Sequence, residues 1–506
     1  MDKAKLTAHK EFTIAPVDKR LYGTFIEPIH NIVYGNMYNP DHPEADEQGF
    51  RKDIMKHLKD LKTTLIRYPG GNYVSGYRWT DGIGPKDKRP VRFDKAWRAI
   101  DTNQVGIDEY ANYAKKLGIE SMLVVNLGTG TAEEAANEVE YCNMASGTYW
   151  SDLRRKYGNE QPHGIKLWGL GNEMDGPWQI EQKTPLEYGR KAYEAAKMMK
   201  WVDPEIELVA CGSCTNVPGM KTYPEWDRIV LDNCYEHVDY IALHRYYSYD
   251  RNISMVWENP FSVEDIAYLS KDLTSYIDTV LAAADFIKGK KRSDKEIHIS
   301  FDEWGVQTSS NVAPEDCNWT EKVVSKARAM NVIDAVLYGM FLITFLNKCD
   351  RVKIACQSIV IGAMIAADPN GGSYKQTTFY PFQHAATYGN GIVLQQKLYS
   401  PLVKTEHFGK QPAIQSAVVY NPENNEITVF AINLNLREDI AIETDFSSFG
   451  HVELVEHIQI HDEQPLAGNT FENPYRIVPK NVEVDKNSDS VILPKLSWNV
   501  LRFEIK

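Results

Sequence analysis

The 506-residue sequence predicts an α/β protein, a (β/α)8 TIM barrel followed by an all-β, jelly-roll-like sandwich. Three observations lead to this fold class. The first two-thirds of the chain alternates strand and helix, and its strands are continuous apolar runs, as parallel strands covered on both faces require. After about residue 385 strand patterns continue without a convincing helix. We therefore expect a barrel over residues 19–384 and a sandwich over residues 385–506, with residues 1–18 adding a strand to the sandwich.

The barrel prediction rests on eight strand–helix units in succession. Strands are expected at residues 21–26, 63–68, 120–126, 165–172, 206–212, 238–244, 296–302 and 351–356. Helical periodicity is expected at residues 50–62, 106–118, 131–145, 186–201, 225–237, 272–289 and 326–348, with a last apolar helix after the eighth strand. Gly118 stands where a helix C-cap is expected. Active sites of such barrels lie at the C-terminal ends of the strands.

Composition limits the possible partners. The formal net charge of −13 argues against nucleic acid and anionic membranes and suits a neutral ligand. The longest apolar stretches, residues 335–346 and 354–367, are shorter than the ~20 residues that span a bilayer, so we expect no membrane partner. Seven scattered cysteines and an N-terminus without an apolar signal region predict a cytoplasmic location. Cys211 and Cys214 form a lone CxxC, which we interpret as structural.

Polar residues occur where the predicted strands end, and in a barrel these positions surround one pocket. Taken in chain order they are Glu27, Arg67, Asn72, Asn126, Asn172, Glu173, His244, Tyr246, Asp302, Glu303 and Gln357. Glu173 follows the fourth strand and Glu303 follows the seventh, so two carboxylates are expected to converge.

Two carboxyl groups on either side of a glycosidic bond are the minimal machinery for its hydrolysis. One protonates the leaving oxygen, and the other attacks the anomeric carbon or activates water, so their surroundings must differ. The rings of Trp97, Trp178 and Trp304 could stack on a sugar. These residues together predict a glycoside hydrolase with Glu173 and Glu303 as its catalytic pair.

Structural roles also fit several of these residues when each is considered alone. Arg67 could serve only as a counter-ion to Glu303, and a histidine such as His244 is more often a hydrogen-bonding residue than a catalyst. Asp302 is expected to face the barrel wall. Trp79 and Trp168 are expected in the core.

The sequence resembles the family 51 glycoside hydrolases, the intracellular α-L-arabinofuranosidases. The segments that carry this resemblance include KLWGLGNEMDGPWQI around Glu173, HISFDEWGV around Glu303, LYGTFIEPIHNIVYGNMYNP near the N-terminus, and HVDYIALHRYY. The match extends in order from the first strand to about residue 385.

The resemblance implies a retaining double displacement, with Glu173 as general acid/base and Glu303 as nucleophile. It implies an arabinofuranosyl group held by Glu27, Asn72, Asn172 and Tyr246, with Arg67 beneath the nucleophile and Trp97 near the edge of the subsite. His244 is counted among the substrate-binding candidates. No metal or organic cofactor is implied. The expected partners are an arabinose-containing oligosaccharide and further copies of the chain in a homo-oligomer.

The sequence departs from the family pattern in three places. After the eighth strand it reads ACQSIVIG where ACLAQLVN is common, so Ile359 takes the position of a sugar-binding glutamine and Gln357 lies two residues earlier. Gln357 is carried over as a sugar contact on this basis only. Pro28 follows Glu27 where histidine is usual, and GVQTSSN follows the tryptophan after Glu303 where aromatic residues are frequent.

Three alternatives stay open from the sequence. The same machinery could act on another sugar, as a β-xylosidase or a β-1,4-glucan hydrolase. A metal-dependent barrel enzyme could use Glu173, His244, Asp302 and Glu303 as ligands for Mg²⁺ or Mn²⁺. The third alternative is a sugar-binding protein without catalytic activity, which the paired glutamates disfavour.

Overall fold

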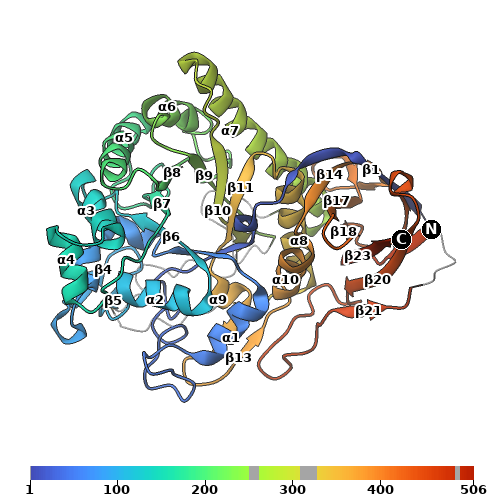
Figure 1. Cartoon of the computed structure of the whole chain (residues 1–506). Helices are drawn as coiled ribbons and strands as arrows, with labels where there is room; N and C mark the ends of the chain where they lie inside the picture. Colours follow the sequence, from blue (N-terminus) through green and yellow to red (C-terminus); the bar gives the residue numbers. More distant parts are fainter. Residues whose placement is uncertain (1, 250–260, 308–318, 320–327, 485–489) are drawn as a thin grey trace.

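The computed structural model describes residues 2–249, 261–307, 319, 328–484 and 490–506. It contains a closed barrel and, beside it, an all-β region (Figure 1). Both parts of the predicted fold class are therefore confirmed.

The barrel consists of eight parallel strands that close in the order β10-β11-β2-β3-β6-β7-β8-β9. In chain order these are β2 (Gly23–Phe25), β3 (Leu65–Tyr68), β6 (Glu120–Val125), β7 (Leu167–Leu170), β8 (Glu207–Cys211), β9 (Tyr240–Tyr247), β10 (His298–Val306) and β11 (Val352–Gln357). One buried apolar cluster draws side chains such as Phe25, Met122 and Ile354 from strands all around the ring. Because this cluster fills the interior, a ligand can bind only at an end of the barrel.

Helices surround the barrel, and their ends follow local capping rules. They are α1 (Lys52–Leu61), α2 (Ile107–Leu117), α3 (Ala132–Asn143), α4 (Tyr149–Lys156), α5 (Pro185–Val202), α6 (Glu225–Cys234), α7 (Leu269–Lys291), α8 (Val332–Asn347), α9 (Val360–Ala363) and α10 (Phe379–Tyr388). Thr131 and Thr184 begin α3 and α5 with capping boxes, and Gly118 ends α2 with a left-handed φ of 70°. Within the described part of the chain, every helix is too short or too polar to cross a membrane.

Two predicted elements differ from the structure in their limits. The helix expected over residues 326–348 begins only at Val332, because Asn331 caps it: Asn331 Oδ1 accepts from the Asp334 amide at 3.2 Å, and Asp334 Oδ2 accepts from the Asn331 amide at 2.8 Å. Residues 326–327 of that prediction lie outside the described residues. Strands β9 and β10 run three and four residues further than predicted, to Tyr247 and Val306.

The C-terminal region is a sheet of nine strands in the order β21-β20-β23-β18-β17-β14-β1-β19-β22. They are β1 (Asp2–Pro16), β14 (Ile392–Tyr399), β17 (Ile414–Asn421), β18 (Glu426–Asn433), β19 (Ile440–Asp445), β20 (Val452–Ile460), β21 (Lys480–Val482), β22 (Ser490–Leu493) and β23 (Ser497–Ile505). Strand β1 pairs with β14 and with β19, so the start of the chain lies within this sheet. Division of the chain between residues 384 and 385 stays a prediction.

Three short antiparallel hairpins complete the described strands. They are β4 (Arg92–Asp94) with β5 (Ala99–Asp101), β12 (Ile365–Ala367) with β13 (Ser373–Lys375), and β15 (Leu402–Lys404) with β16 (Lys410–Pro412). The β4–β5 hairpin carries Trp97 at its turn, and this places a predicted site residue close to the barrel.

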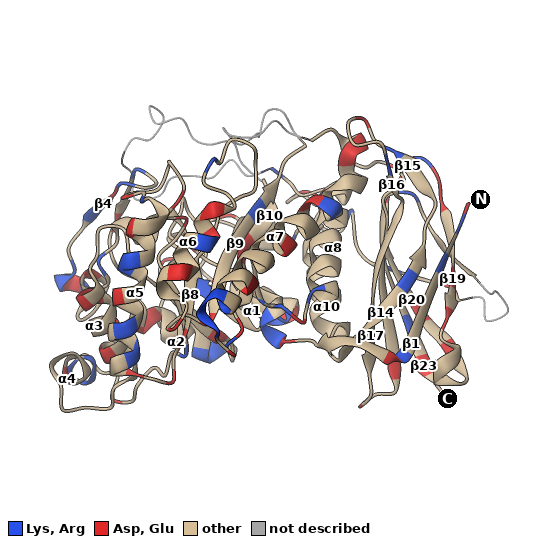
Figure 2. Ribbon diagram, turned by 90° about the horizontal axis from the view of Figure 1, so that it is seen from above, with Lys and Arg blue, Asp and Glu red and all other residues tan. Residues whose placement is uncertain are grey.

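Helix α8 joins the barrel to the C-terminal sheet. Both views place α8 and α10 between the two parts (Figures 1 and 2), and the residues of α8 from Val332 to Leu346 are buried throughout. Gly339 lies against the Trp498 ring of β23, whose Nε1 donates to His384 of α10 at 3.1 Å. A helix that is apolar on every side is expected where two layers cover it.

Gly339 offers a test of this packing. A Cβ at this position would lie 2.4 Å from Trp498 Cε3, so we expect Gly339→Ala to lower the free energy of unfolding by about 1–3 kcal/mol through overpacking. Gly289→Ala in α7 is the matched control, because, apart from its own helix backbone and chain neighbours, no atom of the described residues lies within 4 Å of its Cβ position. This control should be neutral or stabilising by roughly 0.5–1 kcal/mol. Urea unfolding followed by tryptophan fluorescence measures both changes, and equal midpoints for the two variants would contradict the packing.

Candidate active site

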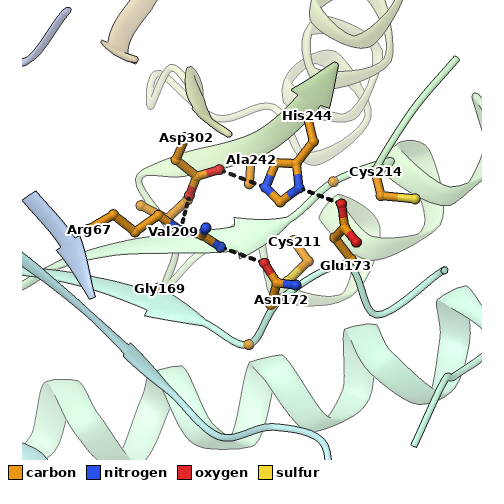
Figure 3. Close-up of a pocket in the computed structure, with 12 residues that line it drawn as sticks. Arg67, Gly169, Asn172, Glu173, Val209, Cys211, Cys214, Ala242, His244 and Asp302 are labelled. Carbon is orange, nitrogen blue, oxygen red and sulfur yellow. Dashed lines mark hydrogen bonds and ion pairs between the residues drawn. The ribbon is translucent and has the colours of Figure 1, made fainter. Parts of the chain in front are cut away.

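The predicted site residues converge at the C-terminal end of the barrel strands. Figure 3 shows Arg67, Asn172, Glu173, His244 and Asp302 pointing toward one another from β3, from the chain after β7, and from β9 and β10. The C-terminal ends of these strands surround one end of the closed ring, so residues more than 200 positions apart meet in one pocket.

Glu173 lies at the end of a strained turn. After β7 the backbone is left-handed at Gly171, with φ 85°, and again at Glu173, with φ 43°. A left-handed conformation is uncommon for a residue with a side chain and is found preferentially at functional sites. The carboxylate of Glu173 is fixed by two donors: Trp178 Nε1 lies 2.6 Å from Oε2, and His244 Nδ1 lies 2.9 Å from Oε1.

A β-bulge in β10 brings two adjacent acids to the site. Ser300 pairs with Ala242 and Glu303 with His244, so β10 has one more residue than β9 between these two pairs. The same extra residue appears against β11. In a regular strand neighbouring side chains face opposite sides, and a bulge breaks this alternation. Asp302 and Glu303 can therefore both contact His244, and the expectation that Asp302 faces only the barrel wall is wrong.

Glu303 is buried and surrounded by donors. Arg67 Nη1 donates to its Oε2 at 3.0 Å, and the Tyr246 hydroxyl donates to its Oε1 at 2.6 Å. One carboxylate oxygen of Glu173 lies within 4.8 Å of one of Glu303. Burial raises the pKa of Glu303, the charge of Glu173 adds to this rise, and His244, Arg67 and Tyr246 act in the opposite direction. Its ionised form therefore depends on these three neighbours.

His244 occupies the centre of the cluster. Its Nε2 lies 3.1 Å from Asp302 Oδ1, while its Nδ1 lies 2.9 Å from Glu173 and 3.6 Å from Glu303. Burial opposes protonation of the ring, but the three carboxylates outweigh it and raise the pKa of His244 to about 10. At neutral pH the ring is an imidazolium that donates from both nitrogens.

Arg67 supplies the second cation. Besides Glu303, its guanidinium donates to Asn172 Oδ1 at 2.6 Å and lies 3.5 Å from Asp302 Oδ2, with the Phe25 ring beneath it at 4.7 Å. Because the Asn172 oxygen accepts this bond, its NH₂ group is oriented toward Asn72, at 3.5 Å. The same NH₂ group also lies 3.4 Å from Gln179 Oε1, so these contacts fix the orientation of the amide.

Glu27 forms the other wall of the site. Its Oε1 accepts from the Tyr73 amide at 2.8 Å and from Trp97 Nε1 at 2.7 Å, and burial raises the pKa of Glu27 well above its ordinary value. Gly71 has a φ of 73°, and a Cβ there would lie 2.3 Å from the Glu27 carboxyl. At position 71, in the Pro-Gly-Gly segment of residues 69–71, only glycine leaves room for this carboxylate.

Two predicted site residues lie away from the carboxylates. Trp304, expected to stack on a sugar, is fully buried and packs against Phe341 of α8 with ring centroids 5.0 Å apart, so that prediction is wrong. Gln357 is also fully buried, and its amide donates to Tyr338 of α8 at 2.7 Å. The interpretation of Trp79 and Trp168 as core residues is confirmed.

Ser358 is a site residue that sequence reasoning missed. Its hydroxyl contacts the hydroxyl of Tyr246, which in turn contacts Glu303. A single serine between Gln357 and Ile359 belongs to no motif, so the sequence offers no signal for it.

A metal ion could use one atom each from Glu173, His244 and Glu303, which lie within 4.8 Å of one another. Such an ion would have to displace the proton of His244, because only a neutral imidazole coordinates a metal. Cys211 and Cys214 are buried and unoxidised, and the Cys214 amide donates to Asp175. Their interpretation as structural residues fits these contacts.

The fold and the site together define a class of protein. A (β/α)8 barrel whose fourth and seventh strands lead to two glutamates, with oxygens within 4.8 Å, has the arrangement of a retaining glycoside hydrolase. Comparison with known proteins agrees. The profile of the α-L-arabinofuranosidase 1 domain matches residues 57–255, and that of the α-L-arabinofuranosidase C-terminal domain matches residues 302–497.

Full-length relatives identify the family. An intracellular exo-α-(1→5)-L-arabinofuranosidase of Acetivibrio thermocellus is 45% identical over 99% of each chain, and one of Bacillus subtilis is 44% identical over 100% of this chain and 99% of its own. The structure of a family 51 α-L-arabinofuranosidase from Bifidobacterium longum is 36% identical, with a TM-score of 0.93 over 100% of both chains. The chain belongs to the family 51 α-L-arabinofuranosidases, as its sequence predicted, and the β-xylosidase and glucan hydrolase alternatives are not favoured.

The raised pKa of His244 predicts how stability depends on pH. The imidazolium stabilises the fold fully below the ordinary pKa of 6.5, and this contribution is lost as the pH rises through about 10. The difference in unfolding midpoint between wild type and His244→Gln should therefore shrink steadily from pH 7 to pH 10.

His384→Gln is the control for this measurement. Burial lowers the pKa of His384 to about 4, so it is neutral in both the folded and the unfolded state above pH 7. The effect of His384→Gln on the unfolding midpoint should therefore stay constant from pH 7 to pH 10. A constant difference for His244→Gln as well would contradict the assignment of an imidazolium.

Proposed function

We propose that the chain removes terminal α-L-arabinofuranosyl residues from arabino- or arabinoxylo-oligosaccharides, with retention of configuration. The observation that carries this proposal is the separation of Glu173 and Glu303, whose nearest oxygens lie within 4.8 Å. Retaining enzymes need carboxyl groups about 5–5.5 Å apart, whereas inverting enzymes need ~6.5–9.5 Å to admit a water molecule. The names of the Acetivibrio thermocellus and Bacillus subtilis relatives support α-(1→5) bonds as the first linkage to test.

In the first step Glu303 attacks the anomeric carbon, and Glu173 gives its proton to the departing oxygen. Three contacts divide these roles. Arg67 and Tyr246 stabilise negative charge on Glu303, which favours the ionised nucleophile. Among the described residues Glu173 is paired with the cation of the shared His244 alone, so it is the better place for the proton. In the second step Glu173 takes a proton from water, and the water attacks the glycosyl ester.

The net charge of the cluster stays at zero through both steps. At the start, Arg67 and His244 are positive, Asp302 and Glu303 are negative, and Glu173 is protonated. In the covalent intermediate Glu303 is a neutral ester and Glu173 is negative, so the sum is again zero. His244 Nδ1 lies 2.9 Å from Glu173 and 3.6 Å from Glu303, and can stabilise whichever carboxylate is ionised. No large change in local charge has to be solvated by water.

The remaining contacts suit the hydroxyls of one arabinofuranosyl ring. Glu27 offers its second carboxyl oxygen, and the side-chain amides of Asn172 and Asn72 lie next to each other, with Asn172 Nδ2 3.5 Å from Asn72 Oδ1. The ring of Trp97 is partly exposed and offers an apolar face, and its Nε1 donates to Glu27. Tyr246 contacts the nucleophile directly. Gln357 does not enter this proposal, because its amide is directed toward α8.

The cellular setting is also inferred. Both relatives are named intracellular, which supports the cytoplasmic location expected from the sequence. The substrate would then be a short oligosaccharide, because intact polysaccharide does not cross the cell membrane. A homo-oligomer remains the expectation from the family resemblance, with neither nucleic acid nor membrane as a partner.

Replacement of each glutamate tests the two roles. Glu303→Ala should lower turnover of the p-nitrophenyl α-L-arabinofuranoside by on the order of 10⁴-fold or more, because it removes the nucleophile. Azide should rescue this variant and give a glycosyl azide of inverted configuration. Glu173→Ala should lose less activity on this good leaving group, and azide should give the retained product. Near-normal turnover of Glu303→Ala would disprove the assignment.

A substrate panel tests the activity of the wild-type enzyme. We expect hydrolysis of the aryl α-L-arabinofuranoside to exceed that of the aryl β-D-xyloside and β-cellobioside by at least about 10²-fold, since each unmatched hydroxyl leaves polar groups unpaired. Dialysis against EDTA should leave the rate unchanged. Loss of activity with EDTA that Mg²⁺ or Mn²⁺ restores would favour the metal-dependent alternative.

A further inference from the structure

The hydroxyl of Tyr246 has two partners, and they lie on two different strands. It donates to Glu303 Oε1 of β10 at 2.6 Å and contacts Ser358 Oγ just beyond β11. Ser358 is only 4% exposed, so water does not compete for its hydroxyl.

Counting hydrogens fixes the direction of these bonds. The positions of the heavy atoms suit Tyr246 as the donor in both contacts, but a phenol has one hydrogen to donate, and an ionised carboxylate can only accept. The hydrogen of Tyr246 must therefore go to Glu303 when Glu303 is ready to attack. The remaining contact can form a hydrogen bond only if Ser358 donates to the phenol oxygen. The order of donation is Ser358 to Tyr246 to Glu303.

We propose that Ser358 is a positioning residue for the nucleophile, which acts through Tyr246 by donating to its phenol oxygen. This inference rests on the proposed function, because it takes Glu303 to be the nucleophile. A donor behind the phenol polarises its O–H bond and strengthens the bond to the carboxylate. It also holds the phenol at a fixed angle to Glu303 while the carboxylate is converted to an ester.

The backbone around Ser358 is held in place for this contact. The Ser358 amide donates to the Trp304 carbonyl at 2.8 Å, one residue after Glu303, so the serine and the nucleophile share one anchor. The next residue, Ile359, has φ 58° and ψ 66°, a conformation that is an outlier for a β-branched side chain. The chain turns sharply at this point and leaves the serine beside Tyr246.

The expected effect is on the ionisation of Glu303. Tyr246 is among the groups that hold the pKa of Glu303 down, against burial and Glu173. Without Ser358 this bond weakens, so the pKa of Glu303 rises and the acidic limb of the kcat/KM profile moves to higher pH. The other ionisable groups that face this carboxylate are unchanged by the substitution. They are Arg67, Glu173, His244, Glu27 and Asp302.

The test compares pH profiles of kcat/KM on the p-nitrophenyl α-L-arabinofuranoside. For Ser358→Ala we expect the acidic limb to move up by about half a pH unit and kcat/KM at the optimum to fall roughly tenfold. Ser358→Cys keeps a side chain of similar size with a weaker donor, so its limb should lie between wild type and Ser358→Ala.

Ser300→Ala is the matched control. Ser300 lies on β10, the strand that carries Glu303, and is fully buried, and its hydroxyl has no hydrogen-bond partner among the described residues. Like Ser358→Ala, this substitution removes one buried hydroxyl, but it should leave the acidic limb of the kcat/KM profile in place.

A double-mutant cycle separates action through Tyr246 from a general structural effect. In a Tyr246→Phe background the phenol oxygen is absent, so Ser358→Ala should cause no further shift. Unmoved acidic limbs in both Ser358→Ala and Ser358→Cys would overturn the inference, as would an equal shift in the Phe background. Failure of the proposed function would appear separately, as activity retained by Glu303→Ala.

Discussion

The site depends on how charge is compensated where water scarcely reaches. Asp302 and Glu303 are 2% and 8% exposed, and burying carboxylates without partners would cost several kcal/mol each. Arg67 carries a permanent charge, but one guanidinium cannot balance two acids and Glu173 as well. The barrel meets this demand with His244, which is cationic because the carboxylates surround it. Ionisation at the site is therefore set within the cluster, and removal of one member changes the protonation of the others.

The fold delivers this cluster through the register of β9 and β10. His244 and Tyr246 are two residues apart and share one face of β9, so both reach Glu303. The bulge in β10 turns Asp302 toward the same histidine from the opposite side. A strand without the extra residue would present only one of the two acids to His244, and Arg67 would then balance a different set of charges.

The sequence predicts the barrel well because its evidence is repeated: eight apolar strands, each followed by a helix, reinforce one another. The strand-end rule likewise finds Glu173 and Glu303, because a carboxylate after a buried strand is conspicuous. A bulge leaves no such pattern. Simple alternation from Glu303 would direct both Asp302 and Trp304 away from the site, which is right for Trp304, packed on α8, and wrong for Asp302. Ser358 was missed for another reason, since its role exists only through a tyrosine 112 positions away.

Backbone strain marks both sides of the pocket. Glu173 and Ile359 each adopt a left-handed conformation, at φ 43° and 58°, which costs of order 1–3 kcal/mol per residue. Such conformations persist only where surrounding contacts impose them: Trp178 and His244 hold Glu173, and Gln376 holds the loop beyond Ile359 through the Gly362 carbonyl. At Ile359 the family resemblance implies a glutamine that contacts sugar, whereas here an apolar side chain follows a serine directed at Tyr246. On the inference above, Ser358 supports the nucleophile at the turn where the family resemblance implies a direct sugar contact.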